Sequence, residues 1–233
     1  MTLPHAPRIV ILTGAGISAE SGLKTFRDAG GLWEGHRVED VATPEAFARD
    51  PATVHRFYNL RRAAMATAAP NPAHLALARL EAALPGQVLL VTQNVDNLHE
   101  RAGSRALIHM HGQLSRALCA ACGHRWDAPS TMAPTDPCPA CAARATRPDI
   151  VWFGEIPYQM EAIWSALRHC AIFAAIGTSG QVYPAAAFVQ DAARAGAETV
   201  ELNLARSAVS RDFDRLIEGP ASRTVPDWVA SLL

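Results

Sequence analysis

Four short apolar runs along the chain each end in a glycine or polar turn, and they read RIVILTG (8–14), QVLLVTQN (87–94), AIFAAIG (171–177) and TVELN (199–203). Continuous apolar runs of this length are typical of parallel strands buried on both faces. Two segments with apolar residues at helical spacing separate them, PAHLALARLEAAL (72–84) and AAAFVQDAARAGA (185–197). Alternating strands and helices predict an α/β layered sheet with right-handed crossovers.

Two segments interrupt this alternation. Residues 30–70 contain helical pieces without a clear strand, and residues 115–148 contain four cysteines, several prolines and little periodicity. We interpret both as insertions that form one small module, helical in 30–70 and a zinc ribbon in 115–148. The remaining residues, 1–29, 71–114 and 149–233, would form the α/β part of a single domain.

Composition limits the classes of partner. The net charge is −1, so no global field favours nucleic acid or an anionic membrane. The N-terminal MTLPHAPRIVILTG lacks the pattern of a signal peptide, and the apolar runs are strand-sized, well below a membrane span. We therefore expect a cytoplasmic protein whose cysteines are reduced or bound to metal.

The cysteines have the spacing of a zinc site. Cys119 and Cys122 form one CxxC pair, and Cys138 and Cys141 form a second pair after fifteen residues. Two such pairs predict one structural Zn²⁺ held by four thiolates, which leaves no coordination position for a substrate. A redox role is the alternative, but redox CxxC motifs rarely come in pairs. Cys170 stands beside an apolar run and is expected in the core.

A glycine loop, TGAGISA (13–19), follows the first strand. Gly14, Gly16 and Ala19 fit G-x-G-x-x-A, a pattern whose small residues let backbone N–H groups approach a pyrophosphate. The motif predicts nucleotide binding. No second strand ends in Asp or Glu some 20 residues later, as it would in an ordinary dehydrogenase. A loop with several glycines, SGLKTFRDAGGLWEG (21–35), stands there instead. In this loop Arg27 is a candidate phosphate ligand, and simple packing would account for Phe26.

Polar residues follow the second strand in TQNVDNLHERAG (92–103). Gln93, Asn94 and Asp96 would lie at the carboxyl end of the sheet, where they suit hydroxyl and carboxamide groups of a ligand. The alternative is a helix start capped by Asn94 or Asp96. In the following IHMHG (108–112), His109 and His111 are both candidates for a general base.

Together these motifs resemble the sirtuins, the NAD-dependent protein-lysine deacylases. The resemblance covers nearly the whole chain and rests on seven ordered segments: GAGIS (14–18), TFRD (25–28), QNVDNLH (93–99), HG (111–112), VWFGE (151–155), GTS (177–179) and ELN (201–203). The zinc knuckles lie between HG and VWFGE, where the family inserts its zinc module.

The resemblance implies a doubly wound, Rossmann-like sheet with a small zinc-binding and helical module, and NAD between the two. It implies removal of an acyl group from lysine, yielding nicotinamide and an O-acyl-ADP-ribose. His111 would be the base, Asn94 would orient ribose or water, and Val151 and Phe153 would flank the acyl-lysine. The implied cofactor contacts are Gly14, Ala15, Gly16, Glu20, Thr25, Phe26, Arg27, Trp33, Gln93, Asn94, Asp96, Gly177, Thr178, Ser179, Asn203 and Ala221.

One stretch points to the class III branch of the family, which includes bacterial enzymes. LKTFR (23–27) and Asn97 resemble that branch, and Tyr58 and Arg61 match its Tyr-x-x-Arg pair in the acyl pocket. A succinyl or malonyl group ends in a carboxylate, and burying that charge requires a partner such as the two-pronged guanidinium of Arg61. The alternative is an ordinary helix edge with the Arg61 stem on an aromatic ring. Arg62 is expected on a solvated face.

Two other functions compete with a deacylase that accepts succinyl, malonyl and acetyl groups. A mono-ADP-ribosyltransferase would use the same NAD cleavage with another acceptor, but His111 and the VWFGE segment argue against it as the main role. A zinc-ribbon protein that binds nucleic acid would need a basic run with interleaved aromatic residues, which 115–148 does not have. We therefore expect acyl-lysine proteins as partners, and neither nucleic acid nor a membrane.

Overall fold

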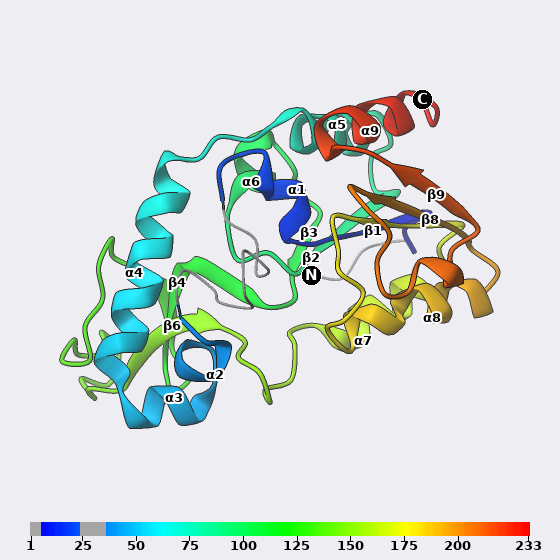
Figure 1. Ribbon diagram of the computed structural model, residues 1–233. Coiled ribbons are helices and arrows are strands. Elements are labelled where there is room, and N and C mark those ends of the chain that lie inside the picture. The colour runs from blue at the N-terminus through cyan, green and yellow to red at the C-terminus, as the bar shows by residue number, and fades with distance from the viewer. Residues whose placement is uncertain (1–5, 24–35) are drawn as a thin grey trace.

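The computed structural model describes residues 6–23 and 36–233 (Figure 1). The described residues form one all-parallel sheet of six strands in the order β3-β2-β1-β7-β8-β9. Its strands are β1 (Ile9–Thr13), β2 (Val88–Thr92), β3 (Leu107–His109), β7 (Ile172–Ile176), β8 (Glu198–Asn203) and β9 (Arg215–Glu218). The four apolar runs are thus confirmed as the central strands. The order runs outward from β1 in one direction and from β7 in the other, so the sheet is doubly wound and changes direction between them.

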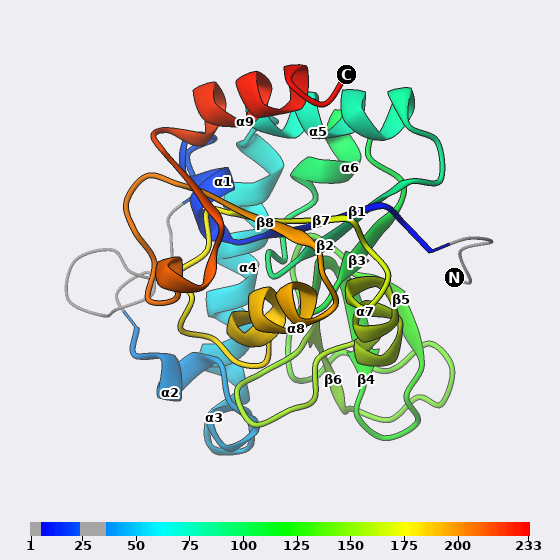
Figure 2. The same cartoon turned by 90° about the vertical axis from the view of Figure 1, so that its right-hand side faces the viewer.

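Helices cover both faces of this sheet. In Figure 2, one layer holds α1 (Ala15–Ala19), α5 (Pro72–Ala83), α6 (Leu98–Ala102) and α9 (Ala221–Ala230), and the other holds α7 (Met160–Leu167) and α8 (Phe188–Arg194). The turn η1 (Ala185–Ala187) precedes α8, so the expected helix 185–197 is a 3₁₀ turn joined to a shorter α-helix. Alternate residues of β1 enter different cores, Val10 and Leu12 on the α7–α8 side and Ile9 and Ile11 on the α5–α9 side. This explains why the strand is apolar throughout.

The small module lies at one end of the large sheet (Figure 1). Its helices are α2 (Val38–Val41), α3 (Pro44–Arg49) and α4 (Pro51–Thr67), and its antiparallel sheet has the order β5-β4-β6, from β4 (Gly112–Cys119), β5 (Arg125–Asp127) and β6 (Thr146–Ile150). A third core joins α4 to this sheet and contains Phe57, Tyr58, Leu114 and Trp152. The predicted fold class, a parallel sheet with a small inserted module, is therefore confirmed.

Local signals explain where the long helix of the module begins. The Asp50 carboxylate accepts a hydrogen bond from the backbone N–H of Thr53 at 3.0 Å, and Pro51 occupies the first turn. Both features favour a helix start. The helix then runs for 17 residues, contains the Tyr58–Arg62 stretch and packs against β4 and β6 of the small sheet.

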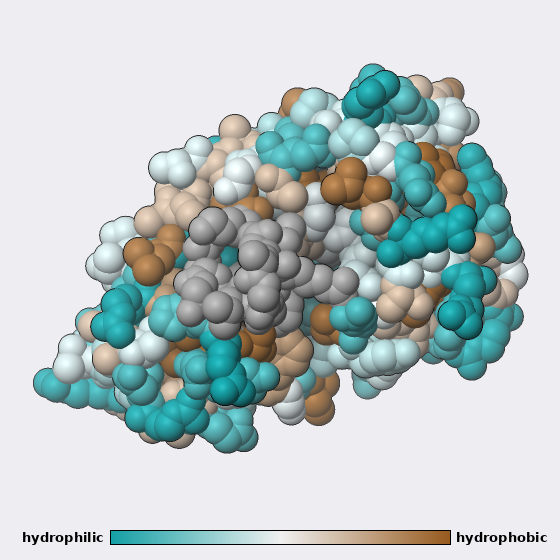
Figure 3. All heavy atoms as spheres, in the orientation of Figure 1, coloured by the Kyte–Doolittle hydropathy of each residue, from teal (hydrophilic) through white to brown (hydrophobic). Residues whose placement is uncertain are grey.

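None of the helices within residues 6–23 and 36–233 is long and apolar enough to cross a membrane. On the face shown in Figure 3, hydrophobic residues form small separate patches among hydrophilic ones. The last short element, the 3₁₀ turn η2 (Ser210–Asp212), lies between β8 and β9.

Candidate active site

A cavity of about 460 Å³ lies at the carboxyl ends of the parallel strands and reaches the small module. Residues from both parts of the molecule line it, although they come from segments far apart in the sequence. Those expected from the sequence are Gly14, Ala15, Gly16, Tyr58, Arg61, Gln93, Asn94, Asp96, His111, Val151, Phe153, Gly177, Thr178, Ser179 and Asn203. The structure therefore brings most of the candidate residues to one place.

Two candidate residues lie elsewhere. The Glu20 carboxylate accepts the backbone N–H of Ser222 at 3.0 Å, in the first turn of α9 beside Ala221. Neither Glu20 nor Ala221 lines the cavity, so their contact with a cofactor stays a prediction. Thr25, Phe26, Arg27 and Trp33 lie outside the described residues.

The loops after β1 and β7 meet backbone to backbone at the point where the sheet changes direction. The Gly16 N–H donates to the Gly177 carbonyl at 2.9 Å. A Cβ on Gly14 would stand 2.7 Å from the Gly177 oxygen, and a Cβ on Gly177, whose φ is +62°, would stand 2.4 Å from the Ile17 nitrogen. Only glycine fits this contact. The close approach leaves backbone surface beside the cavity, which suits a pyrophosphate better than bulky side chains would.

Ser18 connects two polar candidates on the neighbouring loop. Its hydroxyl accepts from Asn94 Nδ2 at 3.1 Å and donates to Asp96 Oδ2 at 3.0 Å. Asp96 Oδ1 also accepts the backbone N–H of Leu98 at 3.1 Å, at the start of α6. The N-cap position of α6 belongs to Asn97, so Asp96 closes a short turn just before the helix and also lines the cavity. Burial raises the pKa of Asp96, which its hydrogen bonds to Leu98 and Ser18 oppose.

The two histidines of IHMHG differ in their surroundings. His109 Nε2 pairs with Glu100 Oε1 at 2.7 Å, and its Nδ1 bonds the Asn94 carbonyl at 3.1 Å, so both of its nitrogens are engaged. His111 lines the cavity, and its Nδ1 lies 3.2 Å from the Gln93 carbonyl. Because a carbonyl can only accept, Nδ1 carries the hydrogen and Nε2 of the neutral ring can take a proton. Burial lowers the pKa of His111, which favours the neutral ring near pH 7 and so leaves Nε2 able to accept a proton.

A buried polar layer lies behind this loop. His99 Nε2 lies 2.9 Å from Thr13 Oγ1, the His74 and His99 rings are 5.0 Å apart, and His74 Nε2 lies 3.5 Å from Ser18 Oγ. Burial lowers the pKa of His74 to about 4 and that of His99 well below its ordinary value. Both rings are therefore neutral, and they connect the core to the loop that carries Asn94 and Asp96.

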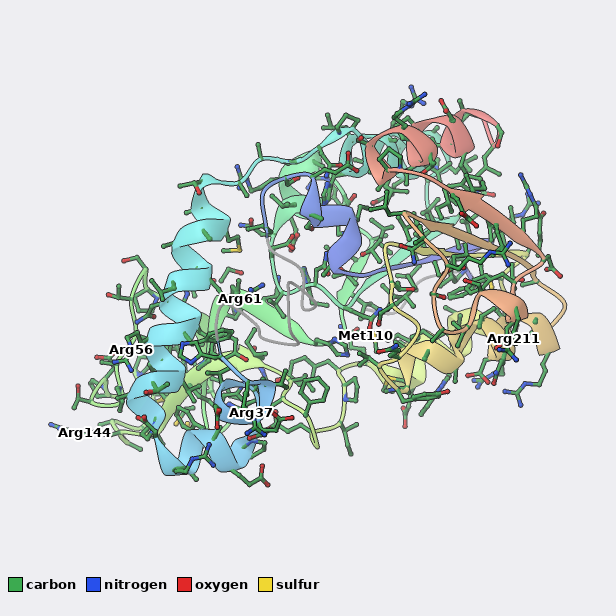
Figure 4. All side chains as sticks on the ribbon, viewed as in Figure 1. Arg37, Arg56, Arg61, Met110, Arg144 and Arg211 are labelled. Atoms are coloured by element: carbon green, nitrogen blue, oxygen red, sulfur yellow. The ribbon has the colours of Figure 1, made fainter. Side chains whose placement is uncertain are left out.

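The wall on the small module is built by α4 and the segment after β6. Tyr58 is 1% exposed, and its hydroxyl accepts the indole N–H of Trp152 at 3.0 Å. The Arg61 guanidinium lies 6.0 Å from the centre of the Phe57 ring and reaches the cavity. Figure 4 places Arg61 on the side of α4 that faces the large sheet and Arg56 on the outer side. Tyr58 is thus part of a buried wall rather than an ordinary solvated helix edge.

The expectation for Arg62 was wrong. Arg62 is 6% exposed and donates to the Leu114 carbonyl at 2.8 Å and to Asn59 Oδ1 at 2.7 Å. Asn59 in turn exchanges two hydrogen bonds of 2.9 Å with the backbone of Met132. These polar groups hold α4 against β4 and the zinc ribbon. The helix is therefore covered on the side of Arg62 as well as on the side of Tyr58 and Arg61.

Several residues that line the cavity were not expected from the sequence, and Ser18 and Trp152 are two that bond to expected site residues. Ser18 was part of the GAGIS motif, and its position one turn after Gly14 was the only signal of its role. Trp152 stands between Val151 and Phe153, and strict alternation along an extended segment would put it on the opposite side from them, although all three line the cavity. Its partner Tyr58 is 94 residues away, which no local pattern could connect.

The four cysteine sulfurs lie within 4.8 Å of one another. The distances from Cys119 to Cys141 and from Cys122 to Cys138 are 3.7 and 3.8 Å. A tetrahedral Zn²⁺ with bonds of about 2.3 Å requires sulfur separations of about 3.8 Å. The cluster therefore fits a structural zinc ion, with Cys119 and Cys138 buried and the other two exposed. Cys170 is 5% exposed and lies in the core, as expected.

Comparison with protein families gives one match over most of the chain. The model described as "Sir2 family" matches residues 14–184, which include the glycine loop, both histidines of IHMHG and the four cysteines.

Individual relatives extend the likeness to the whole chain. An "NAD-dependent protein deacylase" of Bdellovibrio bacteriovorus is 57% identical over 236 residues, covering 100% of each chain. A protein of the same description from Escherichia coli (strain K12) is 56% identical over 230 residues, covering 97% of this chain and 82% of the relative. A solved structure described as a Sir2 homolog–NAD complex superimposes with a TM-score of 0.88 at 37% identity, covering 96% of this chain and 88% of that one.

Proposed function

Because the chain belongs to the Sir2 family and is an NAD-dependent protein deacylase, we propose that it removes succinyl and malonyl groups, and acetyl groups as well, from lysine side chains. NAD, when bound in this cavity, would supply the ribose that accepts the acyl group, with nicotinamide as the leaving group. The proposal concerns the acyl group and the residues that act on it.

The cofactor half of the cavity has the groups that the reaction needs. The glycine backbones of the loops after β1 and β7 offer close approach to the phosphates. Asp96 accepts N–H groups and so suits the nicotinamide carboxamide, while Asn94, held by Ser18, suits ribose or the attacking water. His111 Nε2 is the atom that takes a proton from a ribose hydroxyl.

One observation carries the choice of acyl group: Tyr58 and Arg61 line the same cavity as His111. A carboxylate at the end of an acyl chain loses its hydration when it enters such a site, and this costs several kcal/mol unless it is paired. The guanidinium of Arg61 offers two parallel donors, and the hydroxyl of Tyr58 offers a third. Val151 and Phe153 line the same cavity, and their apolar side chains suit the lysine stem.

The test is a panel of acetyl-, malonyl- and succinyl-lysine peptides of one sequence, with NAD, for the wild type and for Arg61→Met and Tyr58→Phe. We expect Arg61→Met to reduce kcat/KM for succinyl-lysine by about 10²-fold, since a charge-assisted pair is lost, and acetyl-lysine far less. Equal losses for both peptides would remove the proposed role of Arg61.

Arg56→Met is the matched control, because Arg56 is an exposed arginine on the outer side of the same helix. It should leave the whole panel unchanged. Transfer of labelled ADP-ribose to a protein without release of any acyl group would contradict the deacylase proposal and favour a mono-ADP-ribosyltransferase.

A further inference from the structure

Trp152 makes a buried contact whose chemistry is directional. Its indole Nε1 donates to the Tyr58 hydroxyl oxygen at 3.0 Å, and the two residues are 2% and 1% exposed. An indole N–H can only donate, so the Tyr58 proton cannot be given to this partner. The Tyr58 oxygen therefore accepts the hydrogen bond from Trp152, and the O–H bond of Tyr58 points in another direction.

The indole is held in one orientation from several sides. The Arg147 guanidinium lies 3.5 Å from the centre of the Trp152 ring, and the Phe47 ring centre lies 5.2 Å away. Arg147 is fixed in turn by Glu155 at 2.7 and 2.9 Å, and Glu155 accepts the backbone N–H of Trp152 at 2.8 Å. A donor held this firmly can set the rotation of a hydroxyl.

We propose that Trp152 is a positioning residue for acyl selectivity: its indole N–H orients the Tyr58 hydroxyl so that this hydroxyl donates to an acyl group ending in a carboxylate. The inference rests on the proposed preference for succinyl and malonyl groups and extends it to Trp152, which lines the same cavity and donates to Tyr58. A phenylalanine at position 152 would keep the stacking on Arg147 and the packing against Phe47 but would lose the donor.

The protonation state of Tyr58 agrees with this role. Burial raises the pKa of Tyr58 well above its ordinary value, although Trp152 and Arg61 oppose the shift. The hydroxyl therefore remains a donor at every pH at which the enzyme would be assayed.

The experiment compares the wild type with Trp152→Phe, Tyr58→Phe and the double variant, using succinyl- and acetyl-lysine peptides. We expect Trp152→Phe to lower the succinyl-to-acetyl ratio of kcat/KM by about fivefold, mainly through KM for succinyl-lysine, since one hydrogen bond is misdirected. In the Tyr58→Phe background the same substitution should not change the ratio further, because the hydroxyl it orients is absent.

Trp164→Phe is the control for replacing a tryptophan, because Trp164 is 40% exposed and lies on α7, remote from the cavity lining. It should leave the ratio at the wild-type value, and thermal melting shows whether each variant is folded. An unchanged ratio in folded Trp152→Phe, or an equal fall with and without Tyr58, would overturn the inference. A wild type without activity on succinyl-lysine would instead refute the proposed acyl preference itself.

Discussion

The two walls of the cavity are built in different ways. The cofactor wall consists of loops at the ends of parallel strands, where backbones meet at Gly14, Gly16 and Gly177. There the short side chain of Ser18 holds the side chains of Asn94 and Asp96 by hydrogen bonds. The acyl wall consists of long side chains on α4 and after β6, joined across the chain by the Tyr58–Trp152 hydrogen bond. In the proposed function, the first wall serves chemistry common to every acyl group, whereas the second distinguishes among them.

The largest effect is expected for a substitution in the cofactor wall. His111→Ala should reduce turnover of acetyl- and succinyl-lysine alike by roughly 10²- to 10⁴-fold, because it removes the general base that both reactions share. Steady-state release of nicotinamide measures the loss, and calorimetry checks that NAD still binds. His169→Ala, an exposed histidine at the end of α7, is the control. A loss confined to one acyl group would break the division between the two walls.

The buried histidines behind the cofactor wall predict acid sensitivity. The pKa of His74 is about 4 in the folded protein against 6.5 in the unfolded chain. The unfolded state therefore binds a proton that the folded state refuses, and stability that is complete above pH 6.5 is lost as pH falls toward 4. His74 alone accounts for about 3 kcal/mol at pH 4, and His99 acts in the same direction.

Urea unfolding at several pH values measures this dependence. In His74→Gln the slope of the unfolding free energy against pH between 4 and 6.5 should fall by the amount that corresponds to the uptake of about one proton on unfolding. A slope identical to that of the wild type would show that His74 is protonated in the folded state.

Arg62→Met tests the back of the acyl wall. It should lower the unfolding free energy by about 2 kcal/mol, because the buried Leu114 carbonyl loses its donor. Urea unfolding measures the change, and Arg56→Met on the outer side of α4 is the matched control. A change below about 0.5 kcal/mol would place Arg62 with ordinary surface residues after all.

The smallest effect is expected at the edge of the zinc ribbon. Arg116 Nη1 pairs with Asp127 at 2.6 Å, but that carboxylate is 92% exposed. Arg116→Ala should change the unfolding free energy by less than about 0.5 kcal/mol and leave the succinyl-to-acetyl ratio unchanged. A clear shift in the ratio would mean that the acyl wall extends further into the small module than the cavity does.

The cofactor wall could be predicted from the sequence because its signals are local. Strand, glycine turn and polar residue follow one another within a few positions, and Asn94 and Asp96 were found for this reason. The edge strands β3 and β9 were missed, since each has only three or four residues. Runs of that length do not stand out from turns.

The acyl wall was predictable only in part. Tyr58 and Arg61 share one side of a helix, which spacing reveals. The burial of Arg62 depends on Leu114 and Asn59 and on the approach of β4, so it is a property of tertiary packing. The same holds for Trp152, whose partner lies on α4. Helical spacing shows which residues share one side of a helix, but it does not show how many sides of that helix are buried by neighbouring elements.

His111 lies between the two sheets, because β3 ends at His109 and β4 begins at Gly112. A Cβ on Gly112 would stand 2.1 Å from the Asp149 carbonyl oxygen, so the chain has no slack at this junction. The proposed base therefore lies at the junction between the large sheet and the small module, whereas Arg61 lies on α4 within the small module. A small rotation of the small module against the large sheet would therefore displace Arg61, the proposed carboxylate receptor, more than it would displace His111.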